Sequence, residues 1–123
     1  MAVQKPREIA VRVLQLRETE PVFVEDLFER ELADARISPV DRALCQELVY
    51  GICRWQETLD WLIARKTEGR EQRPDMMILL RLGLYQMFWL DRIPNHAAVH
   101  ETVEIAKKLG FIPQRDRKST RLN

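Results

Sequence analysis

Residues 74–90, PDMMILLRLGLYQMFWL, give the strongest indication of the fold class. Its apolar residues show none of the every-second-residue alternation that marks a half-buried strand, and Arg81 is the one charge after Asp75. A helix that is apolar on all sides belongs in the interior of a bundle. We therefore predict a helix from Pro74 to Leu90 and expect it to be the central and most buried helix.

Prolines divide the rest of the chain into blocks of helical length, and none of them lies inside an apolar-periodic stretch. Within the blocks the apolar residues recur at spacings of three and four, which is the pattern of amphipathic helices. The second block predicts a helix from Phe23 to about Ala35. The first block carries an apolar stripe of Ile9, Ala10, Val13, Leu14 and Leu16.

The third block has the clearest helix start. Ser38 can accept a hydrogen bond from the first turn, Pro39 suits the first helical position, and Asp41 places a carboxylate at the positive end of the helix. Gly51 costs about 1 kcal/mol relative to Ala in mid-helix, so we expect a neighbouring helix to approach closely there. A kink or short break is expected at residues 55–58, before the apolar residues Leu59, Trp61, Leu62 and Ile63.

The remaining blocks complete the fold prediction. Residues 66–73 form a charged loop. A sixth helix is expected after Pro94, with Asn95 as its N-cap and an apolar stripe of Val99, Val103 and Ala106. Because no segment alternates as a strand does, the sequence predicts an all-α bundle of five to seven helices.

Composition narrows the class of protein. The chain has 123 residues, of which 46% are hydrophobic and 32% charged, which suits one globular domain. No apolar run approaches the roughly 20 residues that span a bilayer, and the first residues do not resemble a signal peptide, so we expect no membrane partner. Two cysteines are too few for a disulfide scaffold. These features favour the reducing cytoplasm.

The residues offer little catalytic chemistry. Cys45 and Cys53 lie in the third helix, where small buried side chains are expected. His96 and His100 are four residues apart, but no third ligand accompanies them, so no metal site is predicted. No Gly-rich phosphate loop is present. We therefore predict no catalytic residue and no metal ligand in this chain.

Cations near the start of the chain suggest a nucleic-acid partner. Lys5, Arg7, Arg12 and Arg17 could follow a phosphate backbone. By charge alone a solvated face is the better interpretation, because Glu8, Glu18 and Glu20 balance these cations and the net charge is only +1.

Two further pairs lie in the third helix. Arg42 and Arg54 are twelve residues apart and project from nearly the same side. Tyr50 and Trp55 could stack on a base, although core packing is the favoured prediction for Trp55.

Together the segments resemble a known module. They are DRALCQELVYGICRW (41–55) with Leu-Asp at 59–60, ILLRLGLYQMFWLDRIPNHAAVHETVEIAKKLG (78–110) and, more loosely, PREIAVRVL (6–14). The chain resembles the NusB-type RNA-binding domain, which occurs alone as a transcription antitermination factor and fused to the N-terminus of ribosomal RNA methyltransferases of the RsmB (Sun/Fmu) family. The versions ELVYG, LRLGLYQ and RIPNHAAVHETVE are closer to the methyltransferase branch.

That resemblance implies a partner and a parent enzyme. The partner would be 16S ribosomal RNA, and the parent would transfer a methyl group from S-adenosylmethionine to C5 of a cytidine. The cofactor and the nucleophilic cysteine would belong to a downstream methyltransferase domain, so neither Cys45 nor Cys53 inherits that role, and this chain would hold no cofactor and be inactive alone.

The resemblance also implies residue roles. Its RNA contacts map onto Lys5, Arg7 and Arg12, whereas Arg42 either contacts RNA or caps an acidic partner inside the bundle. Arg81 is expected to donate to loop carbonyls, because a buried cation must be paired. Other polar groups are expected to tie the fifth and sixth helices together, namely Tyr85, Gln86 and Glu101.

The expected domain spans residues 1–115. Residues 116–123, DRKSTRLN, resemble a translated sequencing adapter and are expected to form an unstructured tail. The family's bundle closes with a further helix after residue 110, whose loss would expose apolar surface.

Two alternative functions stay open: a free-standing antitermination factor that binds RNA with a ribosomal-protein partner, and a purely structural module.

Overall fold

The computed structural model describes residues 5–110, and every regular element in that range is an α-helix. The helices are α1 (Pro6–Thr19), α2 (Val24–Leu32), α3 (Pro39–Arg54), α4 (Gln56–Lys66), α5 (Pro74–Trp89) and α6 (Asn95–Lys108). The predicted all-α bundle of five to seven helices is therefore confirmed. The tail expected at residues 116–123 lies outside the described residues.

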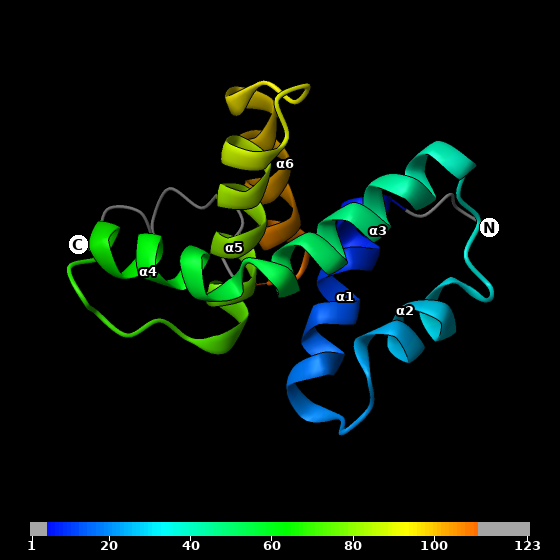
Figure 1. The fold of residues 1–123 in the computed structure, drawn as a ribbon. Coiled ribbons are helices and arrows are strands. Elements are labelled where there is room, and N and C mark those ends of the chain that lie inside the picture. Colours follow the sequence, from blue (N-terminus) through cyan, green and yellow to red (C-terminus); the bar gives the residue numbers. More distant parts are fainter. Residues whose placement is uncertain (1–4, 111–123) are drawn as a thin grey trace.

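The bundle is built around α1, α3 and α5, which contact one another in every pairing. Figure 1 shows α3 running across the molecule, with α2 near one end and α4 continuing from the other. Helix α6 packs along α5, and α2 packs against α1. The core lies where α1, α3 and α5 meet, and its largest fully buried side chains include Phe28, Ile9, Leu48, Ile52, Leu59 and Leu82.

Local signals set the two ends of α3. Ser38 accepts a hydrogen bond from the Asp41 amide at 3.1 Å, and Pro39 follows it at the first helical position, as predicted. The expected break is confirmed too, because Trp55 ends α3 and α4 begins at the next residue. The predicted cap at Asn95 is wrong. Pro94 occupies the cap position of α6, so no side chain caps that helix.

The burial pattern corrects two expectations and shows one exposed tryptophan. Helix α5 is not the most buried helix, because α1 buries six of its 14 residues and α5 five of its 16. Val99 was expected in the buried stripe of α6 but is 47% exposed, whereas Ala98 takes the inward position. Trp61 is 57% exposed, because α4 packs through Leu59 instead. Apolar faces of α4, α5 and α6 are thus open in the described residues.

Gly51 is where α3 and α5 come closest. A Cβ at this position would overlap the hydroxyl and ring of Tyr85 from α5. The expectation of a close approach at Gly51 is therefore confirmed, and its partner is a side chain of α5. Tyr85 in turn stacks on Trp89, with ring centroids 5.5 Å apart and an interplanar angle of 7°.

The polar ties differ from those expected. Arg81 forms two hydrogen bonds with the Asp60 carboxylate of α4, at 2.8 and 3.1 Å, and not with loop carbonyls. Gln86 is fully buried, but it accepts from Arg7 of α1 at 2.6 Å and so ties α5 to α1. Tyr85 ties α5 to α3. The expectation that Tyr85 and Gln86 join α5 to α6 is wrong, because these contacts lead to α3 and α1.

Replacement of Gly51 by Ala should destabilise the fold. The better helix propensity of Ala favours the variant by about 1 kcal/mol, but overpacking against Tyr85 costs about 1–3 kcal/mol, so a net loss of about 1 kcal/mol is expected. Gly83→Ala is the matched control, because its Cβ would meet Thr102 at an ordinary 3.6 Å. Urea titration of both variants measures the difference. A Gly51→Ala variant at least as stable as Gly83→Ala would contradict the close contact.

Loss of the Asp60 carboxylate should also destabilise the fold. The Arg81 side chain is only 12% exposed, so Asp60→Asn leaves a largely buried cation with a weaker partner, at a cost of about 1–3 kcal/mol. Glu29→Gln breaks the exposed pair with Arg42 and should leave the free energy of unfolding almost unchanged. Equal unfolding midpoints for the two variants in urea would show that the Arg81 pair is unimportant.

Candidate nucleic-acid interface

Two of the predicted RNA contacts lie together at the start of α1. Lys5 and Arg7 line one surface cavity of about 250 Å³, which also contains carboxylates. The Arg7 side chain is turned partly inward, where its Nε donates to the buried Gln86. Lys5 is exposed and makes no ion pair among residues 5–110. The carboxylates of this cavity belong to Glu8, Asp41 and Glu101.

The other two predicted RNA contacts lie beside α2. Arg12 of α1 lies 3.4 Å from Glu31, and Arg42 of α3 lies 3.4 Å from Glu29. The Arg42 guanidinium also sits 5.7 Å from the centre of the Phe28 ring. Both arginine side chains are a little under half exposed, and such surface pairs contribute little to stability. The structure thus places Lys5 and Arg7 in one cavity, whereas Arg12 and Arg42 each lie beside a glutamate of α2.

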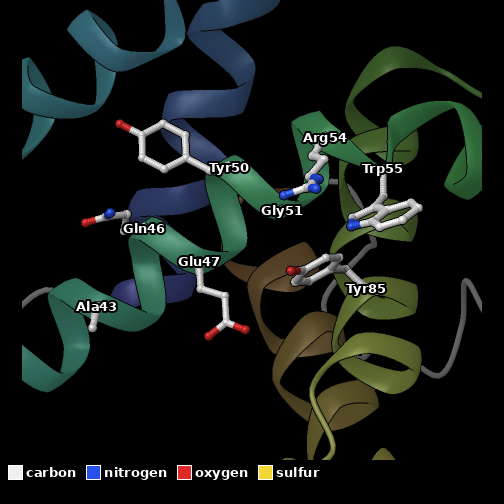
Figure 2. A pocket seen from close by; sticks show the side chains of 8 residues that line it. All are labelled: Ala43, Gln46, Glu47, Tyr50, Gly51, Arg54, Trp55 and Tyr85. Atoms are coloured by element: carbon white, nitrogen blue, oxygen red, sulfur yellow. The ribbon is translucent and has the colours of Figure 1, made fainter.

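A larger cavity lies between α3 and α5. Its volume is about 410 Å³, within the range of sites for small ligands. Seven residues of α3 and its C-terminal end, between Ala43 and Trp55, line it together with Tyr85 of α5. Figure 2 shows Trp55, Arg54 and Tyr85 gathered at one end of this cavity, whereas Tyr50 projects to the other side of α3. We call this cavity the α3–α5 pocket.

Aromatic rings form one wall of the α3–α5 pocket. Trp55 is 39% exposed, and its ring centroid lies 5.6 Å from that of Trp89. Trp89 is stacked on Tyr85, so the three rings form a continuous layer. The Arg54 guanidinium lies 5.9 Å from the Trp55 ring centre and makes no ion pair within the described residues. The prediction that Trp55 packs in the core is therefore only half right.

Polar groups form the rest of the wall. Tyr85 as a whole is only 6% exposed, but its hydroxyl reaches solvent and forms no hydrogen bond within residues 5–110. Burial raises the pKa of this hydroxyl, and the Glu47 carboxylate raises it further. Glu47 itself accepts a hydrogen bond from Arg92 at 2.7 Å. The pocket thus combines an aromatic surface, a carboxylate, a solvent-accessible hydroxyl and an arginine.

The sequence pattern reveals part of this pocket. It singles out Arg54, Tyr50 and Trp55, but it misses Glu47 and gives Tyr85 a purely architectural role. The spacing of residues 43, 47, 50 and 54 could have shown that they share one face of a helix. No sequence feature near Tyr85 indicates that α5 contributes to the same pocket.

The cysteines lie where a nucleophile is not expected. Cys45 is completely buried, and burial raises the pKa of its thiol to about 12. Burial also raises the pKa of Cys53. Reactive thiols have lowered pKa values, so both side chains have the opposite character. This agrees with the expectation that both are small packing residues.

Residues 5–110 contain neither a metal-binding cluster nor a membrane-spanning helix. No group of three or more His, Cys, Asp or Glu side chains there is arranged to hold a metal ion. Nor does that part of the chain contain a helix with the length and hydropathy needed to cross a membrane.

Comparison with known proteins gives consistent matches. The chain is 38% identical over 107 residues to the probable ribosomal RNA small subunit methyltransferase B of Synechocystis, and 36% identical over 105 residues to that of Bacillus subtilis. Each match covers 85% of this chain but 24% of the relative. A 76-residue match to the Pseudomonas putida ribosomal RNA small subunit methyltransferase B is 43% identical, covering 60% of this chain and 17% of that protein.

No solved structure matches the chain. The family assignment rests on a sequence match that is longer than the matches to the individual relatives. The sequence pattern of the NusB family matches residues 4–115, which includes all six helices of the described range. The chain spans about a quarter of the length of the Synechocystis and Bacillus subtilis relatives. This protein belongs to the NusB family.

Proposed function

We propose that this chain is an RNA-binding domain that positions small-subunit (16S) ribosomal RNA for a cytosine-C5 methyltransferase. The observation that carries the proposal is the pair of matches across 85% of the chain to proteins named ribosomal RNA small subunit methyltransferase B. Because the chain spans 24% of those relatives, the methyl transfer itself is assigned to a further domain of the parent protein. The site of action is the cytoplasm.

The residues of this chain suit a positioning role better than the transfer step. S-adenosylmethionine supplies the methyl group, but its binding site does not fit residues 5–110, which contain neither a strand nor a Gly-rich loop after one. The protonated thiol of Cys45 does not suit attack on a base. We assign cofactor and nucleophile to the further domain, and RNA contact to Lys5, Arg7, Arg12 and Arg42.

The sequence of the gene beyond codon 115 tests the link to a methyltransferase. A methyltransferase domain in the same reading frame is expected. A stop codon shortly after codon 115 would instead favour the free-standing antitermination factor. Residues 1–115 are proposed as the domain, with 116–123 as a tail outside it.

RNA binding should depend on salt and on the cations near α1. The Lys5→Ala, Arg12→Ala, Arg42→Ala variant should bind a small-subunit rRNA fragment more weakly, because it releases fewer counterions. Its slope of log affinity against log salt should be shallower by about 0.7 for each lost contact. Filter binding between about 50 and about 200 mM salt measures both quantities.

The control for this variant removes the same charge elsewhere. Lys66, Arg70 and Arg73 lie at and after the end of α4, and their triple replacement by Ala changes the net charge equally. This control variant should keep the wild-type slope of log affinity against log salt. If both triple variants lose affinity equally, binding follows net charge alone and the assigned residues are wrong.

The Cys45 thiol should react slowly and make the fold sensitive to alkali. Its pKa is raised to about 12 in the folded chain from 9.0, so the folded state retains a proton that the unfolded state loses between these values. The free energy of unfolding should therefore fall as pH rises above 9, and less steeply in Cys45→Ala. Urea unfolding at several pH values measures this. Rapid labelling of native Cys45 by a thiol reagent at neutral pH would contradict it.

A further inference from the structure

We propose that the α3–α5 pocket binds one unpaired nucleotide of the RNA, with Trp55 stacking on its base and Arg54 contacting its phosphate. The inference deepens the proposed function and rests on it, because it names the RNA feature that is recognised. It also adds a contact surface distinct from the cations at the start of α1.

The aromatic wall provides the stacking surface. Trp55 is supported from behind by Trp89, at 5.6 Å between ring centroids, and Trp89 by Tyr85 at 5.5 Å. A side chain held in this way keeps its orientation without a ligand, so little conformational entropy is lost on binding. Its 39% exposure leaves area for a base. Base–aromatic stacking is a general means of holding unpaired RNA.

The hydroxyl of Tyr85 adds a polar group at the pocket. It reaches solvent there and forms no hydrogen bond with another group of residues 5–110, so it is free to bond to a ligand. It lines the pocket, and Figure 2 shows it directed toward α3 on the side of Glu47. A ligand that enters the pocket can supply a partner.

Glu47 indicates which bases fit. A carboxylate accepts hydrogen bonds only, and Arg92 fixes this one at the pocket. Cytosine, adenine and guanine present an exocyclic amino group that can donate to it, whereas uracil presents carbonyl oxygens at its corresponding edges. We therefore expect cytosine and adenine to be preferred over uracil.

The charges favour a nucleotide over a peptide as the occupant. The α3 lining residues are mostly polar, and Ala43 is their one aliphatic side chain, so an apolar peptide anchor would find few partners. Arg54 is exposed beside the stacking surface and has no ion-pair partner in the described range. An arginine in this setting suits a phosphate.

The chain contains a matched control for the pocket. On α4, Arg65 lies 5.0 Å from the centre of the Trp61 ring, and Trp61 is 57% exposed. This pair repeats the chemistry of Arg54 and Trp55, but neither residue lines the α3–α5 pocket. Variants of the two pairs therefore distinguish RNA binding in the pocket from RNA binding to any exposed tryptophan beside an arginine.

The experiment measures binding of the 123-residue chain to fluorescent, single-stranded C, A and U oligoribonucleotides of about 12 nucleotides, by anisotropy. Trp55→Leu and Arg54→Gln should each weaken binding to the C oligonucleotide, and loss of the stack alone should cost about 5- to 150-fold. Trp61→Leu and Arg65→Gln should remain within about twofold of wild type, as expected for residues outside the site. Glu47→Gln, which replaces the acceptor-only carboxylate with an amide that also donates, should reduce the preference for C and A over U.

The outcomes distinguish the pocket from the proposed function. If the wild-type chain binds the rRNA fragment with the expected salt dependence but Trp55→Leu and Arg54→Gln bind like the wild type, the pocket proposal is overturned and RNA binding stands. If the chain binds neither rRNA nor oligoribonucleotide, both proposals fall. Unchanged melting curves for Arg54→Gln and Glu47→Gln ensure that a change in binding reflects the site. Equal losses in the α4 controls would also overturn the pocket proposal.

Discussion

The contact between Tyr85 and Gly51 sets how α5 packs on α3 and where the aromatic rings of the pocket lie. Glycine lets the Tyr85 ring lie against the backbone of α3, and this sets how closely α5 packs on it. The same contact buries Tyr85 while leaving its hydroxyl at the α3–α5 pocket, and it places Trp89 behind Trp55. Fold and pocket are therefore linked: a change that separates the two helices also moves the aromatic wall.

Arginine has two uses in this bundle. Arg81 is held by Asp60, and Arg7 and Arg17 donate to glutamines of α5 and α4, so these three join helices. The ends of Arg12 and Arg42 lie beside glutamates of α2. A residue type that suggests RNA in the sequence thus serves packing in part, which is why cation count alone predicts the interface poorly.

The sequence predicts local features of the fold well and pairings between helices poorly. The start of α3 could be predicted, because Ser38, Pro39 and the first-turn amides are adjacent in the chain. The partners of Arg81 and Gln86 could not, since they lie 21 and 79 residues away. Trp55 and Trp61 illustrate the same limit: which face of a helix is covered depends on the neighbouring helices, so the composition of the pocket emerged only from the packing of α5 on α3.

The proposed function does not require this domain to bind RNA tightly. With a net charge of +1, the chain lacks the strong long-range attraction of a basic RNA-binding protein. Within a longer enzyme, however, a weakly bound domain raises the effective concentration of the catalytic domain near its target, and two modest contacts on one chain reinforce each other. A pocket for one unpaired nucleotide adds selectivity that charge alone does not provide, because stacking and base-edge contacts depend on the conformation and base identity of the RNA. The cations near α1 would then bring RNA to the domain, and the aromatic α3–α5 pocket would fix the register in which that RNA is held.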